Sequence, residues 1–203
     1  MKSSTQEIQP IIGTSMGGGF YAGRIRVGED AFALIVAPKE EGEHKDIVWI
    51  AGEKDVPGAK SYFNGVANTI AMLEAGSKLA KWARGLAIGG FDDWYLPSQD
   101  ELEICYRNLK PTTEKNWCYA RSGINLSATE PTYPYTPEFP VQTLAEAFQK
   151  RGAQAFDEAW YWSSTQHASV SDYAWCQDFT NGYQSYYLKG YELRARAVRR
   201  LPI

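Results

Sequence analysis

The residues best suited to covalent chemistry form a short hydroxyl run, Ser163, Ser164 and Thr165. An activated serine needs a neighbouring base and, in many hydrolases, a Gly-x-Ser-x-Gly turn that exposes its hydroxyl. No such turn surrounds this run, and the 2 histidines, His44 and His167, are far apart in the sequence. We therefore expect these hydroxyls to satisfy backbone groups at the end of a strand, and we assign no catalytic residue.

Residue types that bind metals are too scattered to define a site. The 3 cysteines are widely spaced, unlike those of a zinc site or a disulfide framework: Cys105, Cys118 and Cys176. Calcium prefers several converging oxygen ligands, which Asp172, Asp178 and Asn181 would have to supply without a recognisable lectin motif. We expect no metal and no cofactor, with calcium as the alternative.

The charge balance argues against nucleic-acid binding. The net charge is −3 and the pI is near 5.5, whereas a phosphate backbone needs a basic surface. No run approaches the roughly 18 apolar residues of a membrane span, so we expect no membrane insertion. The first residues lack the apolar region of a secretory signal, which favours synthesis in a reducing cytoplasm with free thiols.

The N-terminal part predicts a β-hairpin and a third strand. Residues 20–27 and 31–37 are β-rich, and residues 28–30 between them are typical of a turn. Residues 39–45 contain several glutamates and predict a solvated loop. Residues 46–51 predict a short strand.

Helices are expected in the middle of the chain. Residues 65–84 have apolar side chains at helical spacing, with Asn64 as a plausible N-cap and Ser77 capping a second helix. After Pro97, the pair Ser98 and Glu101 predicts a capping box, in which each side chain bonds the other residue's backbone amide.

The second half predicts a long irregular segment followed by strands. Residues 111–142, called the 111–142 loop below, are rich in Pro, Thr, Tyr and Ser, and residues 143–151 predict a short amphipathic helix. An Asn181-Gly182 turn lies among the closing strands, which are expected at residues 160–165, 173–179, 183–189 and 192–200. The order of elements predicts an α+β protein with a mainly antiparallel sheet.

Three divisions of the chain are expected. Residues 1–18 are polar and Gly-rich and predict a flexible arm or attachment segment. Residues 19–60 form an N-terminal β-rich region, and residues 61–203 form the main domain.

Three short motifs occur in an order that resembles a known family. They are DDWYLPSQDEL at residues 92–102, YWSST at 161–165 and RAVR at 196–199. Together they resemble the Lcl C-terminal-like domain family, whose members are similar to C-type lectins and to the formylglycine-generating-enzyme fold. The resemblance implies short helices and a twisted antiparallel sheet that displays irregular loops, commonly for adhesion or receptor recognition.

The same motifs give expectations for single side chains. We expect Trp94 to be buried beneath the following helix. Arg196 and Arg199 are interpreted as structural, with one of them tying the sheet to a carboxylate such as Asp93. Formylglycine-type oxidases need reactive cysteines late in the domain, and Cys176 has no nearby partner in the sequence, which argues against that reaction.

The N-terminal run GGFYAGR at residues 18–24, together with ALIVAP at 33–38, resembles a version of this domain carried by tailed phages. This resemblance implies a virion protein of the tail, assembled in the host cytoplasm. It also implies contacts with other virion proteins through the N-terminal region.

A candidate ligand-binding face lies in the last third of the chain, which is dense in Tyr, Ser, Asp, Asn and Gln. Such residues combine rigid aromatic area with short hydrogen-bonding groups. Period-two spacing puts some of them on one face, although that face is the core in an alternative interpretation because Phe179 continues it. The candidates are Tyr173, Trp175, Gln177, Asn181, Tyr183, Gln184, Tyr186 and Tyr187.

The expected function is therefore non-catalytic: a phage tail-tip or fibre protein that recognises a bacterial surface glycan or protein receptor. Two alternatives are a structural virion component that binds only phage proteins and a formylglycine-type oxidoreductase. A homotrimer, common among tail fibres, stays open because no coiled-coil heptads are present to enforce one.

Overall fold

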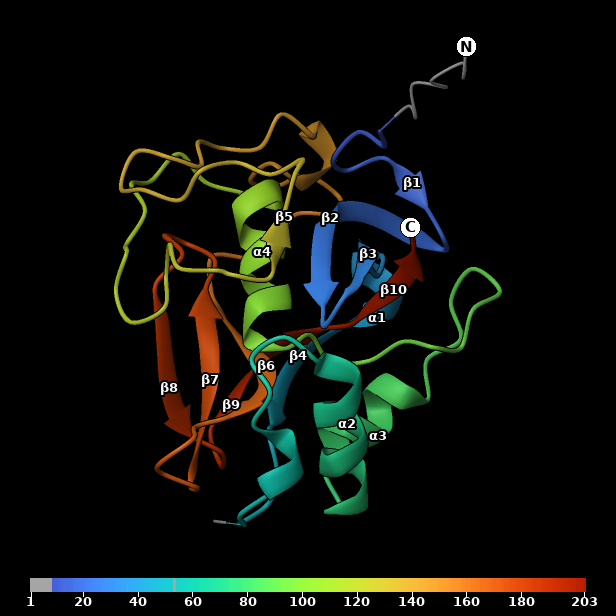
Figure 1. Cartoon of the computed structure of the whole chain (residues 1–203), viewed down its shortest axis with the longest axis vertical. Helices are drawn as coiled ribbons and strands as arrows, with labels where there is room; N and C mark the ends of the chain where they lie inside the picture. The colour runs from blue at the N-terminus through green and yellow to red at the C-terminus, as the bar shows by residue number, and fades with distance from the viewer. Residues whose placement is uncertain (1–8, 53) are drawn as a thin grey trace.

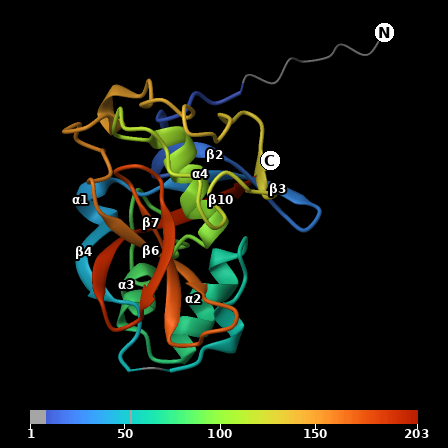
Figure 2. The ribbon, with the colours of Figure 1, turned by 90° about the vertical axis from the view of Figure 1, so that its left-hand side faces the viewer.

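The computed structural model describes residues 9–52 and 54–203 and contains two β-sheets with short helices (Figures 1 and 2). The α+β class is confirmed. The N-terminal sheet has the order β1 (Ser15–Met16), β2 (Gly19–Val27), β3 (Asp30–Val36) and β10 (Val198–Pro202), with β5 (Ala128–Thr129) beside β2. The second sheet has the order β4 (Glu43–Val48), β9 (Glu192–Arg196), β6 (Trp160–Gln166), β7 (Tyr173–Asp178) and β8 (Gln184–Leu188).

The predicted N-terminal hairpin is confirmed. Strands β2 and β3 pair antiparallel and turn at Gly28 and Glu29, where Gly28 has a φ of +64° that favours glycine. Strand β10 pairs with β3 through Val198↔Val36, so both ends of the described chain share one sheet. Residues 1–8 of the expected arm lie outside the described residues, and residues 9–18 include β1, which pairs with β2.

The single terminal strand expected at residues 192–200 is wrong. The chain forms β9 in one sheet and β10 in the other, with Ala197 between them. Ala197 donates its amide to the Gly42 carbonyl and accepts from the Ala37 amide, so its backbone pairs with the connection between β3 and β4. The alternation of polar and apolar side chains holds only as far as Ala197, because apolar Val198 follows it directly and Arg199 and Arg200 are both polar.

The predicted helices and their caps are confirmed. Helix α2 (Gly65–Glu74) begins at Asn64, whose side chain accepts from the Ala67 amide at 3.2 Å. Helix α3 (Lys78–Arg84) begins at Ser77, which accepts from the Ala80 amide at 3.3 Å. Helix α2 packs on β6, and Figures 1 and 2 place both helices at the end of the molecule away from the N-terminal sheet.

Helix α4 (Gln99–Leu109) is the centre of the fold. The capping box of Ser98 and Glu101 is present in both directions, and every residue of the helix is buried. The apolar side packs into the largest core cluster, which includes Leu34 of β3 and Phe179 after β7. Its polar side is covered by the 111–142 loop, which runs beside it in Figure 1.

Two local predictions are wrong. The expected solvated loop at residues 39–45 forms helix α1 (Lys39–Gly42) and the start of β4, because Arg194 pairs with Glu43 at 3.0 Å and leaves that carboxylate 3% exposed. The helix expected at residues 143–151 is reduced to one 3-10 turn, η2 (Glu146–Phe148). Thr143 donates its amide to the Lys110 carbonyl and its hydroxyl to the Asn108 carbonyl, which fixes the chain outside a helix.

The first family motif bridges the sheets. Trp94 is fully buried, but it packs with Tyr21 and Ile35 on the face of the N-terminal sheet opposite α4, not beneath the helix. The predicted pairing with Asp93 is confirmed for Arg199, whose Nε and Nη2 lie 2.6 and 2.9 Å from the two carboxylate oxygens.

Replacing Asp93 by asparagine is expected to lower the free energy of unfolding by about 1 kcal/mol, because a bidentate but half-exposed ion pair loses its charge. Urea unfolding measures this value. Asp92→Asn at the exposed neighbouring position serves as the matched control. Equal effects for the two variants would show that the Arg199 pair contributes nothing specific.

Candidate functional site

The candidate residues of β7 and β8 divide between the two sides of the sheet. Strand β8 is an edge strand, and its register pairs Trp175 with Tyr186 and Ala174 with Tyr187. Because side chains alternate along a strand, Tyr186 and Tyr187 point to opposite sides. The predicted set is therefore not one face.

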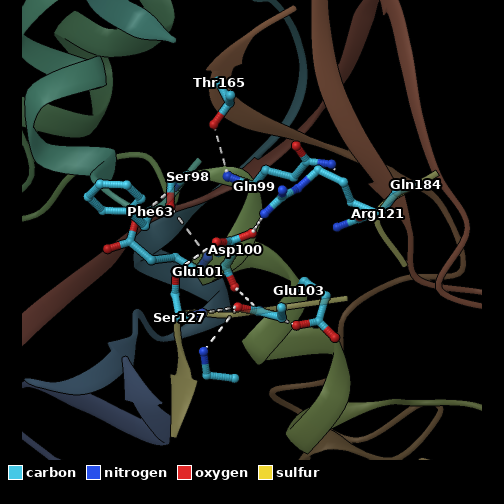
Figure 3. A network of polar contacts seen from close by, with 12 residues as sticks. Phe63, Ser98, Gln99, Asp100, Glu101, Glu103, Arg121, Ser127, Thr165 and Gln184 are labelled. Atoms are coloured by element: carbon cyan, nitrogen blue, oxygen red, sulfur yellow. Dashed lines mark hydrogen bonds and ion pairs between the residues drawn. The ribbon is translucent and has the colours of Figure 1, made fainter. Parts of the chain in front are cut away.

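Two of the predicted residues are interior. Gln177 and Gln184 are each 1% exposed. Gln177 donates its amide to the Gly182 carbonyl, and Gln99 at the start of α4 donates to Gln184 Oε1 at 3.1 Å, as Figure 3 shows. Gln177 therefore stabilises the turn of the β7–β8 hairpin, Gln184 ties the hairpin to the helix, and neither faces an external ligand.

Asn181 and Gly182 lie in the connection between β7 and β8. Asn181 Oδ1 accepts from the Tyr183 amide at 3.1 Å, which uses its side chain locally. Gly182 has a φ of +77°, and an added Cβ would lie 2.1 Å from the Tyr135 hydroxyl oxygen. That hydroxyl donates to the Gly182 carbonyl at 2.8 Å, so only glycine lets the 111–142 loop approach so closely.

One side of β7 and β8 carries a compact ring group, called the Tyr186 cluster: Tyr173, Trp175, Tyr186 and His167. The ring of Tyr186 lies 5.4 Å from Trp175 and 4.5 Å from His167. Trp175 is 7% exposed and Tyr186 is 43% exposed. The cluster therefore presents the exposed ring of Tyr186 and the partly exposed rings of Tyr173 and His167 around a buried indole.

The other side carries a longer row of rings, called the aromatic stripe: Trp117, Tyr119, Tyr183, Trp160, Tyr187 and Tyr191. Tyr183 lies 5.8 Å from Trp117, 5.5 Å from Tyr119 and 5.7 Å from Trp160. The row continues from Trp160 to Tyr187 at 5.2 Å and on to Tyr191 at 5.9 Å. Trp117, Tyr119 and Tyr191 are all more than half exposed, and the other three rings are partly buried.

Three separate segments supply the stripe: the 111–142 loop, the start of β6, and residues 183–191 around β8. Trp160 opens β6, Tyr183 precedes β8, Tyr187 lies within β8 and Tyr191 follows it. Trp117 and Tyr119 come from the 111–142 loop, which is pinned to the hairpin because the Trp117 amide donates to the Asn181 carbonyl at 2.8 Å. Thr112 supports this junction by donating its hydroxyl to the Thr180 carbonyl at 2.6 Å.

Sequence reasoning missed four members of the stripe, Trp117, Tyr119, Trp160 and Tyr191. Trp117 and Tyr119 are spaced two apart, which is typical of side chains sharing a face in extended chain. That spacing does not reveal the contact with Asn181, since the contact joins residues far apart in the sequence.

Polar groups are interleaved with these rings. Asp178 is the cross-strand partner of Trp160, and Ser185 that of Cys176, so both lie on the side of the stripe. Burial is the main cause that raises the pKa of the Tyr187 hydroxyl, so this phenol stays neutral and can both donate and accept hydrogen bonds. The stripe therefore combines apolar ring area with hydroxyl and carboxylate groups.

A second set of polar residues, whose acidic members are buried, lies at the N-terminus of α4 (Figure 3). Asp100 accepts from Arg121 at 2.6 Å and from the Ser127 hydroxyl at 2.7 Å. Glu103 pairs with Arg107 at 2.8 Å and accepts from Asn125. Because Arg121, Asn125 and Ser127 all belong to the 111–142 loop, these acidic side chains clamp the loop onto the helix.

Stability is expected to fall as the pH rises. Burial is the main cause that raises the pKa of Asp100, Glu101 and Glu103, although the facing arginines lower it. The folded state then binds protons more readily than the unfolded chain. The resulting stabilisation is complete at pH values below the ordinary carboxyl pKa, and it is lost as the pH rises through the raised pKa values of the folded state. Urea unfolding should give a larger free energy near pH 4.5, the ordinary glutamate value, than at about pH 8.

The same measurement on Glu103→Gln should give a flatter pH profile, because one titrating group is removed. Glu41→Gln, at an exposed position, should leave the profile unchanged. A free energy of unfolding that rises steadily over this range would contradict the direction assigned to these carboxyls.

The other chemistry-bearing residues have structural surroundings. Ser163 Oγ donates to the Trp175 carbonyl at 2.9 Å and Thr165 Oγ1 to the Ser61 carbonyl at 2.9 Å, which confirms that the hydroxyl run satisfies backbone groups. The three cysteines are free, and burial raises the pKa of Cys105 and Cys176. Within residues 9–52 and 54–203, no three His, Cys, Asp or Glu side chains converge on a potential metal position.

No helix in the described part of the chain is both long and apolar enough to cross a membrane. A search of curated proteins gives no match. The profile of the Lcl C-terminal domain family matches residues 43–199, a span that contains all three sequence motifs and every ring of the aromatic stripe. The chain therefore belongs to the Lcl C-terminal domain family.

Proposed function

We propose that this chain is a non-catalytic binding domain of a bacteriophage tail that recognises a receptor on the bacterial surface. The aromatic stripe carries the proposal, because six neighbouring rings from three segments remain partly or largely exposed. Clusters of Tyr and Trp at a surface supply large, rigid contact area and are typical of recognition sites.

The assignment to a phage tail is supported by the resemblance of residues 18–24 and 33–38 to a version of the domain carried by tailed phages. These residues contribute to β2 and β3 of the N-terminal sheet. In Figure 1, β1 and β10 of that sheet lie on the side of the molecule away from β8. Attachment to a virion through the N-terminal sheet would therefore leave the stripe free to meet a host cell.

The two-sheet architecture with short helices and a long displayed loop is consistent with a C-type-lectin-like domain, as the family resemblance implies. Absence of catalysis is part of the proposal. It is supported by the hydroxyl run, which bonds backbone carbonyls, and by Cys105 and Cys176, which are buried among core residues.

A structural virion component is the second candidate, favoured by one observation. Ile11 is 73% exposed and Leu144 is 82% exposed, and both line a hollow of about 400 Å³ between the N-terminal segment and the chain after the 111–142 loop. An apolar surface of this kind is typical of a protein contact. It would serve assembly, whether or not the stripe binds a host receptor.

The experiment that tests the proposal is binding of fluorescently labelled protein to a panel of bacterial strains, with heat-denatured protein as the control. Strain-selective binding that survives a calcium chelator is the expected result. Loss of binding on chelation would require a metal at the site. Binding to no strain, even when several copies are coupled to one bead to raise avidity, would leave the structural role as the better account.

A further inference from the structure

We infer that the aromatic stripe binds a neutral carbohydrate chain, an inference that rests on the proposed binding function. The faces of a sugar ring carry C–H groups, which pack against the electron-rich face of an aromatic ring. Its hydroxyl groups need polar partners beside that face, since hydroxyls that lose water without a new partner weaken binding. The stripe offers both kinds of partner.

The shape of the stripe favours an elongated ligand. From Trp117 through Tyr183, Trp160 and Tyr187 to Tyr191, each ring lies 5.2 to 5.9 Å from the next. Neighbouring ring planes meet at 59 to 81°, so the row presents faces and edges in several directions. A chain of repeated ring units contacts such a row at several points, whereas one small molecule would contact a single ring pair.

The polar groups within the row match hydroxyl chemistry. Asp178 uses Oδ1 to accept from the Thr180 amide at 2.8 Å, and among the described residues no side chain or amide donates to its Oδ2. A carboxylate oxygen of this kind accepts strongly from a hydroxyl. The hydroxyls of Ser185 and Tyr187 add groups that donate as well as accept.

The charges of the region favour a neutral chain over an acidic one. Asp178 places a negative charge beside Trp160. Lys189, directly after β8, is 1% exposed and donates inward to Gln166 Oε1 at 2.5 Å and to the Lys54 carbonyl at 2.7 Å. All nine cation–π contacts of the described residues use rings outside the stripe, so no guanidinium or ammonium lies over its faces. A sulfated or uronic-acid chain would meet repulsion there without a compensating cation.

The stripe is held in place before any ligand arrives. The Trp117 amide bonds the Asn181 carbonyl, and Ser122 joins the same loop to the hairpin by donating to the Gly182 carbonyl and accepting from the Gln184 amide. Rings fixed by backbone contacts lose little conformational freedom on binding, which lowers the entropic cost of association.

The test uses the full chain and a bacterial strain that it binds. Cells are treated either with periodate, which cleaves vicinal diols of sugars, or with a broad-specificity protease. We expect periodate to reduce binding about tenfold or more and protease to leave it within about twofold, in line with the loss of contacts to several ring residues. Binding that survives periodate and is lost after protease treatment would overturn the inference in favour of a protein ligand.

A second measurement tests the neutrality of the chain. Asp178→Asn keeps the acceptor that Thr180 uses but removes the charge. It should weaken binding to a neutral, hydroxyl-rich ligand by about tenfold, because charge-assisted hydrogen bonds are the stronger ones. For a polyanion the same variant would bind more tightly, and raising the salt from about 0.05 to 0.5 M would weaken the wild type strongly. Tighter binding by Asp178→Asn would therefore contradict the inference.

These outcomes separate the inference from the proposed function. Selective cell binding that resists periodate leaves a receptor-binding domain with another kind of ligand. Binding to no strain removes the proposed function, and the inference falls with it.

Discussion

Replacing Glu101 by alanine is expected to lower the free energy of unfolding by about 3 to 5 kcal/mol, the range for breaking a buried charged pair by removing one partner. Glu101 is fully buried and closes the capping box by accepting from the Ser98 amide at 2.7 Å. It also accepts from the Gly65 amide at 3.1 Å and from the Tyr95 hydroxyl at 2.7 Å. Alanine would leave these donors without their acceptor, with Arg200, now 3.7 Å from the carboxylate, lacking its partner.

Urea unfolding measures the effect of this substitution, with Glu74→Ala on the exposed side of α2 as the control. The control should change the free energy of unfolding by less than about 0.5 kcal/mol. Glu101→Gln, which keeps one acceptor oxygen, should fall between the two. A loss below about 1 kcal/mol for Glu101→Ala would mean that the helix start does not depend on this carboxylate.

The second large effect is expected at Arg196, whose side chain has no exposed surface. Replacement by alanine should cost about 3 kcal/mol or more, because several buried acceptors lose their donor together. Its Nε donates to the Ala37 carbonyl at 2.9 Å, and its Nη1 donates to the Gln154 carbonyl at 2.7 Å. The guanidinium also lies 4.8 Å from the centre of the Phe156 ring, so the substitution removes packing as well.

Arg26→Ala, at an exposed position of β2, is the matched control and should lie within about 0.5 kcal/mol of the wild type. Arg196→Lys should recover only part of the loss, because one ammonium cannot reproduce the geometry of the guanidinium fork. Full recovery by lysine would show that the charge alone, without the forked contacts, holds these segments together.

Features set by neighbouring residues were predictable from the sequence. The capping box of α4 needs only Ser98 and Glu101, three residues apart, and the caps at Asn64 and Ser77 have the same local origin. The hairpin turn at Gly28 is equally local. Each of these predictions holds because the hydrogen bonds involved join residues within one turn of the chain.

Features set by contacts between distant segments were not predictable in the same way. The change of sheet at Ala197 depends on bonds to Ala37 and Gly42, which no local pattern encodes. The helix expected after the 111–142 loop is replaced by one 3-10 turn because Thr143 bonds backbone groups near the end of α4. Tertiary contacts of this kind override local propensity.

The candidate site shows the same division. Period two correctly identifies which side chains of β7 share a side, but it does not tell which side meets solvent. Trp175 and Gln177 share a side, and they are only 7% and 1% exposed. The row of rings on the other side became visible only once Trp160 and the 111–142 loop were placed beside Tyr183.

The central claim is that the aromatic stripe, and not the Tyr186 cluster on the other side of β8, binds the bacterial surface. The most direct measurement compares two double variants on a strain that the wild type binds, after circular dichroism has shown that both are folded. Trp117→Ala with Tyr191→Ala should weaken cell binding about tenfold or more, whereas Tyr173→Ala with Tyr186→Ala should leave it within about twofold. The reverse pattern, with loss only when Tyr173 and Tyr186 are removed, would contradict the claim and move the site to the other side of the sheet.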